Sequence, residues 1–372
     1  MRSALQECMS DGFEPVLAIV FISIKQDRKA VCELMSQQGI DVIGATSCGE
    51  FVNGHESYGE TAMLLLEMDK SYYYLAFEDT HGKDLPETAR RITEEAKAKF
   101  RRPGFILCSS GISTEGEIYD GKTLVHMIET VSGGEIPVFG GMAGDDSVFT
   151  GTYVFNNTQA TDKGFTALVL DQDKILMHGM AVSGWKPMGT LRTVTKSEDG
   201  WLYAIDEQPA LDLYLRYLGK KPVISEGFQK DFFEDIGFSH PFLSYGAGDP
   251  VIRTPMMVDA EKKAIKLDFP IPAGSQIQFT MPPDFDIVET VLEEAAQLIK
   301  EKQAEADALL VFSCVGRLAA LGPMTQEENE GLARLWKVPM AGYYTYGEYG
   351  RGMDGRHGIH STTNSWVALK EK

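Results

Sequence analysis

Three short stretches of this sequence share one glycine pattern, which constrains the fold more than any other feature. In each stretch two glycines enclose a short run, and an acidic residue follows the second glycine. The stretches are residues 44–50 (GATSCGE), 342–348 (GYYTYGE) and, one residue shorter, 140–145 (GGMAGD). The aromatic run of the last motif in the chain favours a β-strand, and a glycine lets the backbone turn sharply where a strand ends. Each acid is therefore expected just past a strand end.

The segments around these stretches also repeat. Each stretch follows an apolar strand and a helical segment, and another apolar strand comes later in the chain. The sequence thus contains three degenerate units with the order strand, helix, strand, strand. The first strands are expected at residues 17–24, 105–108 and 309–314, the helices at 29–38, 124–131 and 327–336, and the last strands at 62–67, 165–170 and 365–369. The units lie too far apart for a solenoid, so we expect pseudo-symmetric lobes.

The alternation of strands and helices predicts an α/β protein with mixed sheets, built in two parts. A chain of 372 residues is long enough for two domains with a sizeable core. Residues 153–197 have the pattern of successive strands without a helix, which suggests an antiparallel meander joined to a mixed sheet. The first two units precede a polar turn at residues 198–200, and the third follows it. We therefore expect a domain at 1–200 and another at 201–372.

The charge of the chain limits the kinds of binding partner that are expected, and its cysteines indicate the cellular compartment. With 35 basic and 54 acidic residues the formal charge is −19, which argues against binding to nucleic acids and to anionic membrane surfaces. The five cysteines are scattered and form no CxxC pair, as expected for reduced thiols in the cytoplasm. The N-terminal segment lacks the apolar core of a signal peptide, and no apolar run reaches the ~18 residues of a membrane span. These features predict a soluble cytoplasmic protein.

The acid in each glycine motif excludes one familiar function and leaves two interpretations. A phosphate-binding P-loop has lysine and then serine or threonine after its second glycine, whereas an acid stands there in this chain. The loops can instead cradle a ligand, with the acid facing a cationic group. Alternatively, the glycines serve only as tight strand ends, and the acids pair with an arginine inside the fold.

Arg317 is well placed to meet an anionic ligand. It follows the strand expected at 309–314, and sites in open α/β sheets lie beyond the carboxyl ends of the strands. Its guanidinium group could bind a carboxylate through two hydrogen bonds. The alternative, which is equally compatible with the sequence, is an internal ion pair with Glu348 or Glu50.

The sequence does not indicate a catalytic or metal centre. A cysteine nucleophile needs a histidine base in reach, and the spacing of the seven histidines does not point to one. Cys48, Cys108 and Cys314 are interpreted as buried, inert thiols. The sequence contains no HExxH motif, no paired cysteines and no EF-hand loop, so we expect no metal site. We also expect no enzyme activity. A hydrolase or transferase that uses Cys48 or Cys314 stays open, as does a purely structural partner protein.

Several motifs together resemble the FIST family of bacterial sensory domains. They are TSCGE at 46–50, GGMAGDD at 140–146, FSCVGR at 312–317 and GYYTYGE at 342–348, with GWKPMG at 184–189 and PALD at 209–212 as further landmarks. The likeness covers nearly the whole chain, through a FIST N-like and a FIST C-like part. The resemblance implies a ligand-binding sensor of signal transduction that binds small molecules such as amino acids. It also implies coupling to histidine kinases, cyclic-di-nucleotide enzymes or chemotaxis proteins, and some relatives bind haem and sense nitric oxide.

We therefore predict a small-molecule-binding sensory protein that binds an amino-acid-like ligand and acts on a separate output protein. The ligand is expected where the glycine-rich strand ends converge, with Arg317 holding an anionic group and Glu348 or Glu50 facing a cationic one. The expected ligand contacts are Cys48, Gly49, Glu50, Gly144, Asp145, Cys314, Arg317, Tyr344, Tyr346, Gly347 and Glu348. No cofactor is expected. The alternative is a haem-binding nitric oxide sensor, which no distinctive histidine context supports.

Overall fold

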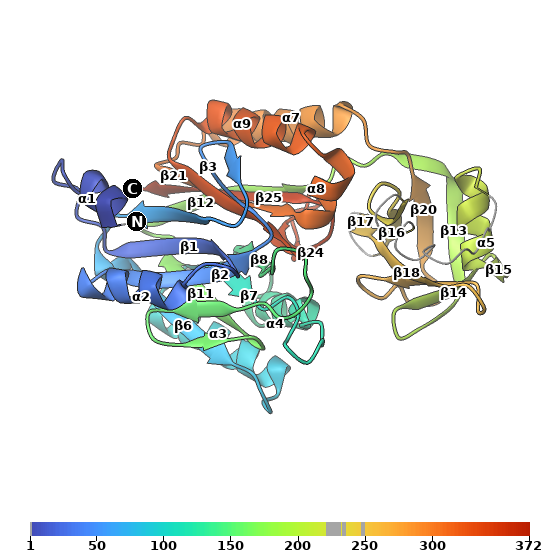
Figure 1. The fold of residues 1–372 in the computed structure, drawn as a ribbon, viewed down its shortest axis with the longest axis horizontal. Helices are drawn as coiled ribbons and strands as arrows, with labels where there is room; N and C mark the ends of the chain where they lie inside the picture. Colours follow the sequence, from blue (N-terminus) through green and yellow to red (C-terminus); the bar gives the residue numbers. More distant parts are fainter. Residues whose placement is uncertain (1, 221–231, 233–235, 247–249) are drawn as a thin grey trace.

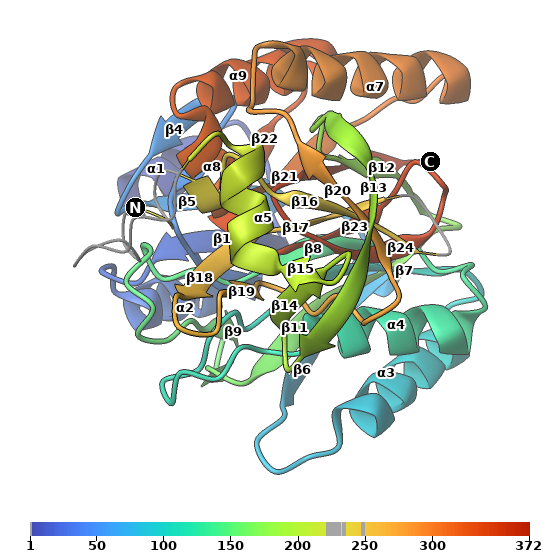
Figure 2. The same ribbon diagram turned by 90° about the vertical axis from the view of Figure 1, so that its right-hand side faces the viewer.

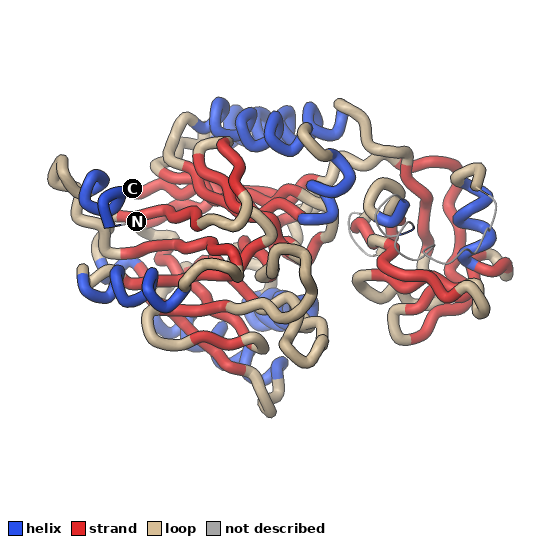
Figure 3. The backbone as a smooth tube through the Cα atoms, in the orientation of Figure 1, coloured by secondary structure: helices blue, strands red, loops and turns tan. Residues whose placement is uncertain are grey.

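A computed structural model shows a large body of three β-sheets and a smaller lobe beside it (Figure 1). The structure describes residues 2–220, 232, 236–246 and 250–372. The lobe is one insertion, which leaves the body after β12 (Ile175–Val182) and returns to it before α7 (Asp286–Lys302), as the tube in Figure 3 shows. Among the described helices, none has both the length and the apolar character that a membrane span requires.

The three units predicted from the sequence are present, and each forms the centre of one body sheet. In every unit the first strand lies between the second strand, which is parallel to it, and the last strand, which is antiparallel. The first strands are β1 (Leu17–Ser23), β7 (Pro103–Ser109) and β21 (Ala308–Cys314), and the helices are α2 (Arg28–Gln37), α4 (Gly121–Ser132) and α9 (Met324–Trp336). The second strands are β2 (Asp41–Ser47), β8 (Val138–Met142) and β22 (Met340–Thr345), and the last are β5 (Thr61–Leu66), β11 (Gly164–Asp171) and β25 (Asn364–Glu371). The predicted repeat and the α/β class are confirmed.

A cyclic exchange of strands links the three sheets. After each glycine-rich strand the chain crosses to another sheet and pairs with the glycine-rich strand there. β3 (Glu50–Val52) joins β22, β23 (Glu348–Arg351) joins β8, and β9 (Val154–Asn156) joins β2. The first unit thus supplies a strand to the third, the third to the second, and the second to the first. This exchange gives the body a pseudo-threefold organisation.

The first glycine of each motif lies opposite an aromatic residue in this exchange. The pairs in register are Gly44 with Phe155, Gly342 with Phe51, and Gly140 with Tyr349. A Cβ atom added at Gly342 would lie 2.1 Å from the Phe51 ring, and one at Gly44 would lie 2.3 Å from the Phe155 ring. Only glycine leaves room for an aromatic ring to cross the backbone so closely.

The remaining strands extend the three body sheets. Their orders are β10-β9-β2-β1-β5, β24-β23-β8-β7-β11-β6 and β12-β25-β21-β22-β3-β4, with β4 (His55–Ser57), β6 (Tyr73–Asp79), β10 (Ala160–Thr161) and β24 (His357–His360) at or near the edges. β9, β11 and β12 therefore join three different sheets, and the antiparallel meander expected at 153–197 is wrong. The apolar pattern predicted these strands but could not predict their partners, which come from distant parts of the chain.

The inner faces of the three sheets enclose one hydrophobic core. Phe21, Phe139 and Tyr343 enter it from different sheets, and the rings of Phe21 and Tyr343 stack with their centroids 4.3 Å apart. Helices cover the outer faces: α1 (Arg2–Cys8) and α2 pack on the first sheet, α3 (Leu85–Lys99) and α4 on the second, and α7 and α9 on the third (Figure 1). The short helices η1 (Lys70–Tyr72) and α8 (Val315–Leu321) complete the body.

The lobe is an antiparallel sheet with a helix on one face (Figure 2). Its strands are β13 (Pro187–Glu198), β14 (Trp201–Ile205), β15 (Gln208–Pro209), β16 (Phe242–Tyr245), β17 (Val251–Arg253), β18 (Pro255–Asp259), β19 (Ala264–Leu267) and β20 (Gln276–Thr280). The helix is α5 (Ala210–Tyr217), whose Tyr214 packs against Phe242 and Phe279 in a separate core. The boundary expected near residue 200 falls between β13 and β14, and the division into domains 1–200 and 201–372 stays a prediction.

Candidate functional site

The ends of the three glycine-rich strands meet in the body. The Cys48 N–H donates to the carbonyl of Tyr344 at 3.0 Å, and the Tyr344 N–H donates to the carbonyl of Gly49 at 2.9 Å. The Gly144 N–H donates to the carbonyl of Thr46 at 2.8 Å. Backbone hydrogen bonds therefore connect residues of all three units at one place, which we call the motif junction. The expected convergence of the strand ends is observed.

The two motif glutamates are buried in this junction and held by equivalent donors. Glu50 and Glu348 each accept a hydrogen bond from a hydroxyl group three residues earlier and another from a later backbone N–H. The donors are Ser47 and Glu60 for Glu50, and Thr345 and Thr363 for Glu348. Desolvation raises the pKa of Glu50 to about 7 and that of Glu348 to about 8, because burial disfavours the charged carboxylate. Both acids tie their motif to the chain that follows it.

Asp145 has a similar place in the second unit. Its buried carboxylate accepts hydrogen bonds from the backbone N–H groups of Phe149, Thr150 and Gly151 at 3.1, 2.6 and 3.0 Å. The hydroxyl of Tyr346 donates to the same carboxylate. Phe149 has a φ of 55°, in the left-handed region that side chains rarely adopt. Asp145 thus stabilises an unusual loop conformation after the glycine motif.

Arg317 has its carboxylate partner inside the fold. Its Nε donates to the Glu328 carboxylate of α9 at 2.9 Å, its Nη2 bonds the same group, and both side chains are 0% exposed. Its Nη1 donates to the Ser183 carbonyl at 2.5 Å, while the Asn364 amide donates to Glu328 at 2.7 Å. The indole of Trp185 lies 5.5 Å from the guanidinium carbon. The ligand role of Arg317 stays a prediction, and these contacts favour its structural alternative, with Glu328 as the partner instead of a motif glutamate.

The two motif thiols are buried beside these acids. Burial raises the pKa of Cys48 to about 11. Burial also raises the pKa of Cys314 well above its usual range, and the neighbouring Glu348 charge adds to this effect. A cysteine reacts as the thiolate, so both side chains have the character of inert thiols at neutral pH.

The remaining predicted contacts also pack into the motif junction. The Tyr344 hydroxyl donates to the Glu56 carboxylate, away from the motif acids. Gly49 has a φ of 129°, and a Cβ atom added there would lie 2.8 Å from the Tyr58 ring and 3.0 Å from the Tyr344 ring. The Gly347 carbonyl accepts a hydrogen bond from the Met142 N–H at 2.7 Å. The junction is thus a densely hydrogen-bonded part of the body.

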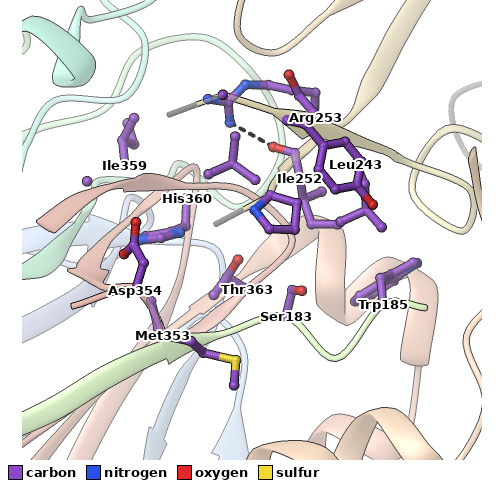
Figure 4. Close-up of a pocket in the computed structure, with 18 of the residues that line it drawn as sticks. Ser183, Trp185, Leu243, Ile252, Arg253, Met353, Asp354, Ile359, His360 and Thr363 are labelled. Atoms are coloured by element: carbon purple, nitrogen blue, oxygen red, sulfur yellow. Dashed lines mark hydrogen bonds between the residues drawn. The ribbon is translucent and has the colours of Figure 1, made fainter. Parts of the chain in front are cut away.

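A cavity of about 750 Å³ lies close by, between the body and the lobe (Figure 4). The body contributes the segment after β12, the turn before β24 and β24 itself, whereas the lobe contributes β16 and β17. The labelled lining residues are Ser183, Trp185, Leu243, Ile252, Arg253, Met353, Asp354, Ile359, His360 and Thr363. None of the predicted contacts is among the residues that line this cavity. Thr363, however, connects its wall to the buried Glu348.

The cavity combines an apolar wall with an excess of positive charge. Among the described residues that line it, four are basic and one is acidic: Lys122, Lys186, Arg253 and Arg356, against Asp354. Because the whole chain has a formal charge of −19, this lining differs from the rest of the molecule. Its apolar surface includes Trp185, Leu243, Ile252 and Ile359. An apolar cavity with a few placed polar groups is the usual form of a small-molecule site.

Arg253 is the most deeply buried of these basic residues. It is 7% exposed and stands on the edge strand β17. Its Nη1 donates to the carbonyl of the preceding Ile252 at 2.7 Å, and the Phe269 ring lies 5.4 Å from its guanidinium carbon. Burial lowers its pKa, while the negative charge of Asp268 acts on it through space. Within the described parts of the chain Arg253 has no ion-pair partner.

Two histidines bring neutral imidazole rings to the same cavity. Burial lowers the pKa of both His357 and His360 to about 4. One ring nitrogen of each lies within hydrogen-bond distance of a backbone carbonyl, at 3.1 Å from Val138 and 3.2 Å from Gly350. Across the described residues, no group of three or more histidine, cysteine or acidic side chains is arranged to hold a metal ion.

Arg253 and His360 are not among the residues predicted from the sequence. The sequence could have drawn attention to Arg253, because this residue ends a short apolar strand. Arginine is uncommon at such a buried position unless it is paired. No comparable signal existed for His360. Its place in the cavity depends on the contact between body and lobe, which the sequence pattern does not reveal.

Two protein-family models match successive parts of the chain. Residues 16–208 match the FIST N domain, and residues 210–351 match the FIST C domain. An uncharacterised protein of Methanocaldococcus jannaschii is 23% identical over 342 residues, which cover 86% of this chain. The match spans 64% of the length of that relative.

Proposed function

Because the chain belongs to the FIST family, we propose that it is a sensory protein that binds a small molecule in the cavity between body and lobe. FIST domains are in general small-ligand-binding domains of signal transduction. The ligand in this proposal is amino-acid-like. The signal passes to a separate output protein, such as a histidine kinase, a cyclic-di-nucleotide enzyme or a chemotaxis protein. The cavity is the observation that carries this proposal.

The cavity suits a ligand better than the motif junction does. At the junction Glu50, Asp145 and Glu348 are buried and accept hydrogen bonds from neighbouring residues. Arg317 is likewise bound to Glu328. A buried polar group that already has its partners gains little from a ligand. In this proposal the glycine motifs position the wall of the cavity through Thr363, and the ligand binds next to them.

The lining offers a place for each part of an amino acid. The positive lining attracts a carboxylate, and Asp354 is the one acid among the described lining residues that could face an ammonium group. The apolar wall accommodates an apolar side chain, and the volume of about 750 Å³ lies within the ordinary range of ligand pockets. The hydroxyl groups of Ser183 and Thr363 supply further polar contacts at the wall.

Filling the cavity tests this proposal. Ser183→Trp places a large ring in the cavity, while Ser10→Trp makes the same change at an exposed position far along the chain. The melting temperature is recorded with each of the twenty common L-amino acids. A ligand at a hundred times its Kd stabilises a protein by about 2.7 kcal/mol, which raises the melting temperature by several degrees. We expect this rise in the wild type and in Ser10→Trp, and no rise in Ser183→Trp.

Two results would count against the proposal. If Ser183→Trp is stabilised as strongly as the wild type, the ligand does not occupy this cavity. If no amino acid stabilises the wild type and none is released from the purified protein on denaturation, the ligand is not amino-acid-like. Met353→Trp, at an exposed lining position, repeats the test should Ser183→Trp fail to fold.

Haem is the second candidate ligand, because two histidines line the cavity. The low pKa of His357 and His360 keeps their rings neutral, which is the form that binds metals. Each ring uses one nitrogen for a contact with a backbone carbonyl and keeps the other nitrogen for a metal. We favour the amino-acid-like ligand because the cavity lining suits both charged groups of an amino acid. A sharp Soret band after addition of haemin, lost in His360→Ala, would favour haem instead.

A further inference from the structure

We infer that Arg253 holds the anionic group of the ligand, so that the cavity selects carboxylates over neutral molecules of the same shape. This inference rests on the proposed function, since it specifies how the same cavity recognises its ligand. The buried position of Arg253 in the cavity lining and its lack of an ion-pair partner within the described residues carry it.

The surroundings of Arg253 leave its charge poorly compensated. Its one side-chain hydrogen bond in the described structure goes to the adjacent Ile252 carbonyl. A guanidinium group has five N–H donors, so most of them stay available for a ligand. The Phe269 ring adds a weak cation–π contact at 5.4 Å. Burying a charge without a partner is costly, so a ligand carboxylate that pairs with Arg253 offsets this cost.

Asp268 is the acid that comes closest to being a partner, but it is engaged elsewhere. Its carboxylate accepts hydrogen bonds from the Thr254 N–H at 2.9 Å and the Phe269 N–H at 2.7 Å, as well as from the Ser361 hydroxyl. It therefore offsets the charge of Arg253 through space without occupying its donors. The guanidinium group keeps donors for an incoming carboxylate.

The position of Arg253 also suits a sensor. Arg253 belongs to the lobe, whereas Ser183, His360 and Thr363 line the cavity from the body. The next residue, Thr254, shares hydrogen bonds with the body hydroxyl groups of Ser361 and Thr362, at 3.1 and 2.8 Å. A carboxylate held by Arg253 thus sits beside the contact that joins the two parts.

Acid and amide probes test the inference together with variants of Arg253. The probes are the twenty common L-amino acids and the carboxamides of those that stabilise the wild type. Isothermal titration compares the wild type, Arg253→Met and Arg253→Lys, with Arg216→Met as a control on the exposed side of the lobe. A charged hydrogen bond contributes about tenfold to a hundredfold to affinity, so Arg253→Met should weaken acid binding by that factor. Arg216→Met should bind like the wild type, and Arg253→Lys should lie between.

The amide probes supply the sharper part of the test. The wild type should bind the carboxamide about tenfold to a hundredfold more weakly than the acid, whereas Arg253→Met should no longer distinguish the two. Equal binding of acid and amide by the wild type would overturn the inference without any variant, which matters if Arg253→Met does not fold.

The inference and the proposed function fail in different ways. If Ser183→Trp abolishes acid binding but Arg253→Met binds the acid as the wild type does, the cavity is the site and the role of Arg253 is wrong. If Ser183→Trp and Arg253→Met both bind the acid normally, the ligand lies elsewhere and the proposed site is wrong as well.

Discussion

Arg317 in the body and Arg253 in the lobe are both buried, yet their surroundings are opposite. Arg317 is 0% exposed, forms several hydrogen bonds to Glu328 and donates to two backbone carbonyls. Arg253 is 7% exposed and lines a cavity, and among the described residues its side chain has one hydrogen bond, to its own neighbour in the chain. The first arrangement completes a fold, whereas the second leaves a charge for a ligand. Burial of a cation is therefore a poor indicator of function until its partners are known.

Removing each arginine in turn should give the largest difference in stability between variants. Arg317→Met leaves Glu328 buried without its partner, and breaking a buried pair costs about 3–5 kcal/mol. Arg253→Met removes a buried charge without a partner among the described residues, so it should not lower the free energy of unfolding of the ligand-free protein. Urea unfolding midpoints measure both effects.

A double variant serves as the control for this experiment. Arg317→Met combined with Glu328→Leu removes both charges and should recover much of the lost stability, because an apolar pair can replace a buried ion pair at little cost. Equal destabilisation by Arg317→Met and Arg253→Met would contradict the comparison, since it would make both arginines structural.

The pH dependence of stability tests whether the motif acids belong to the fold. Burial raises the pKa of Glu50 from its ordinary 4.5 to about 7, so the folded protein keeps the proton while the unfolded chain loses it. The contribution of Glu50 to stability should therefore fall as pH rises from about 4.5 to about 7, by about 3 kcal/mol in total. The variant Glu50→Gln has no ionisable group at this position, so it lacks this pH-dependent contribution to stability. Relative to Glu50→Gln, the wild type should lose stability over this window, and a gain would show that the charged form is favoured.

Weakening the contact between lobe and body should have a smaller effect on stability. Thr254→Val removes hydrogen bonds to Ser361 and Thr362, each of which contributes about 1 kcal/mol. We expect a loss of about 2 kcal/mol in the free energy of unfolding. Ligand binding should also weaken, because Arg253 is the adjacent residue. Thr158→Val, at an exposed turn, is the matched control. Loss of stability without any change in affinity would separate this contact from the ligand site.

Thiol labelling gives the smallest expected effect. Cys8 is exposed, whereas Cys32, Cys48, Cys108 and Cys314 are buried. Iodoacetamide at neutral pH should modify Cys8 and leave Cys48 and Cys314 unmodified in the folded protein, because burial raises the pKa of both thiols. Rapid modification of Cys48 or Cys314 would instead favour a cysteine-dependent hydrolase or transferase.

The sequence predicted the fold more completely than the site. The spacing of glycines, strands and helices was sufficient for the three units, because each unit is built from local patterns with short connections. The exchange of β3, β9 and β23 between sheets was not predictable from the sequence. It depends on contacts between each motif glycine and an aromatic residue from a distant part of the chain. Gly342 and Phe51 illustrate this, because almost three hundred positions separate two residues that lie face to face.

The partner of Arg317 shows why the site was harder to predict. The sequence drew attention to Glu348 and Glu50, whose motifs are conspicuous, but Arg317 pairs with Glu328 on the next helix. Arg253 lies outside every motif, and its cavity forms only where the inserted lobe meets the body. Repeated motifs therefore indicated the framework around the site, while the proposed ligand contacts depend on tertiary packing.

A crystal structure of the protein with its bound amino acid distinguishes the cavity from the motif junction. We predict ligand density in the cavity between body and lobe, with a carboxylate at hydrogen-bond distance from Arg253 and the pair of Arg317 and Glu328 intact. Density for the ligand at the motif junction, in contact with Cys48, Asp145 or Arg317, would show that the ligand binds at the site predicted from the glycine motifs instead.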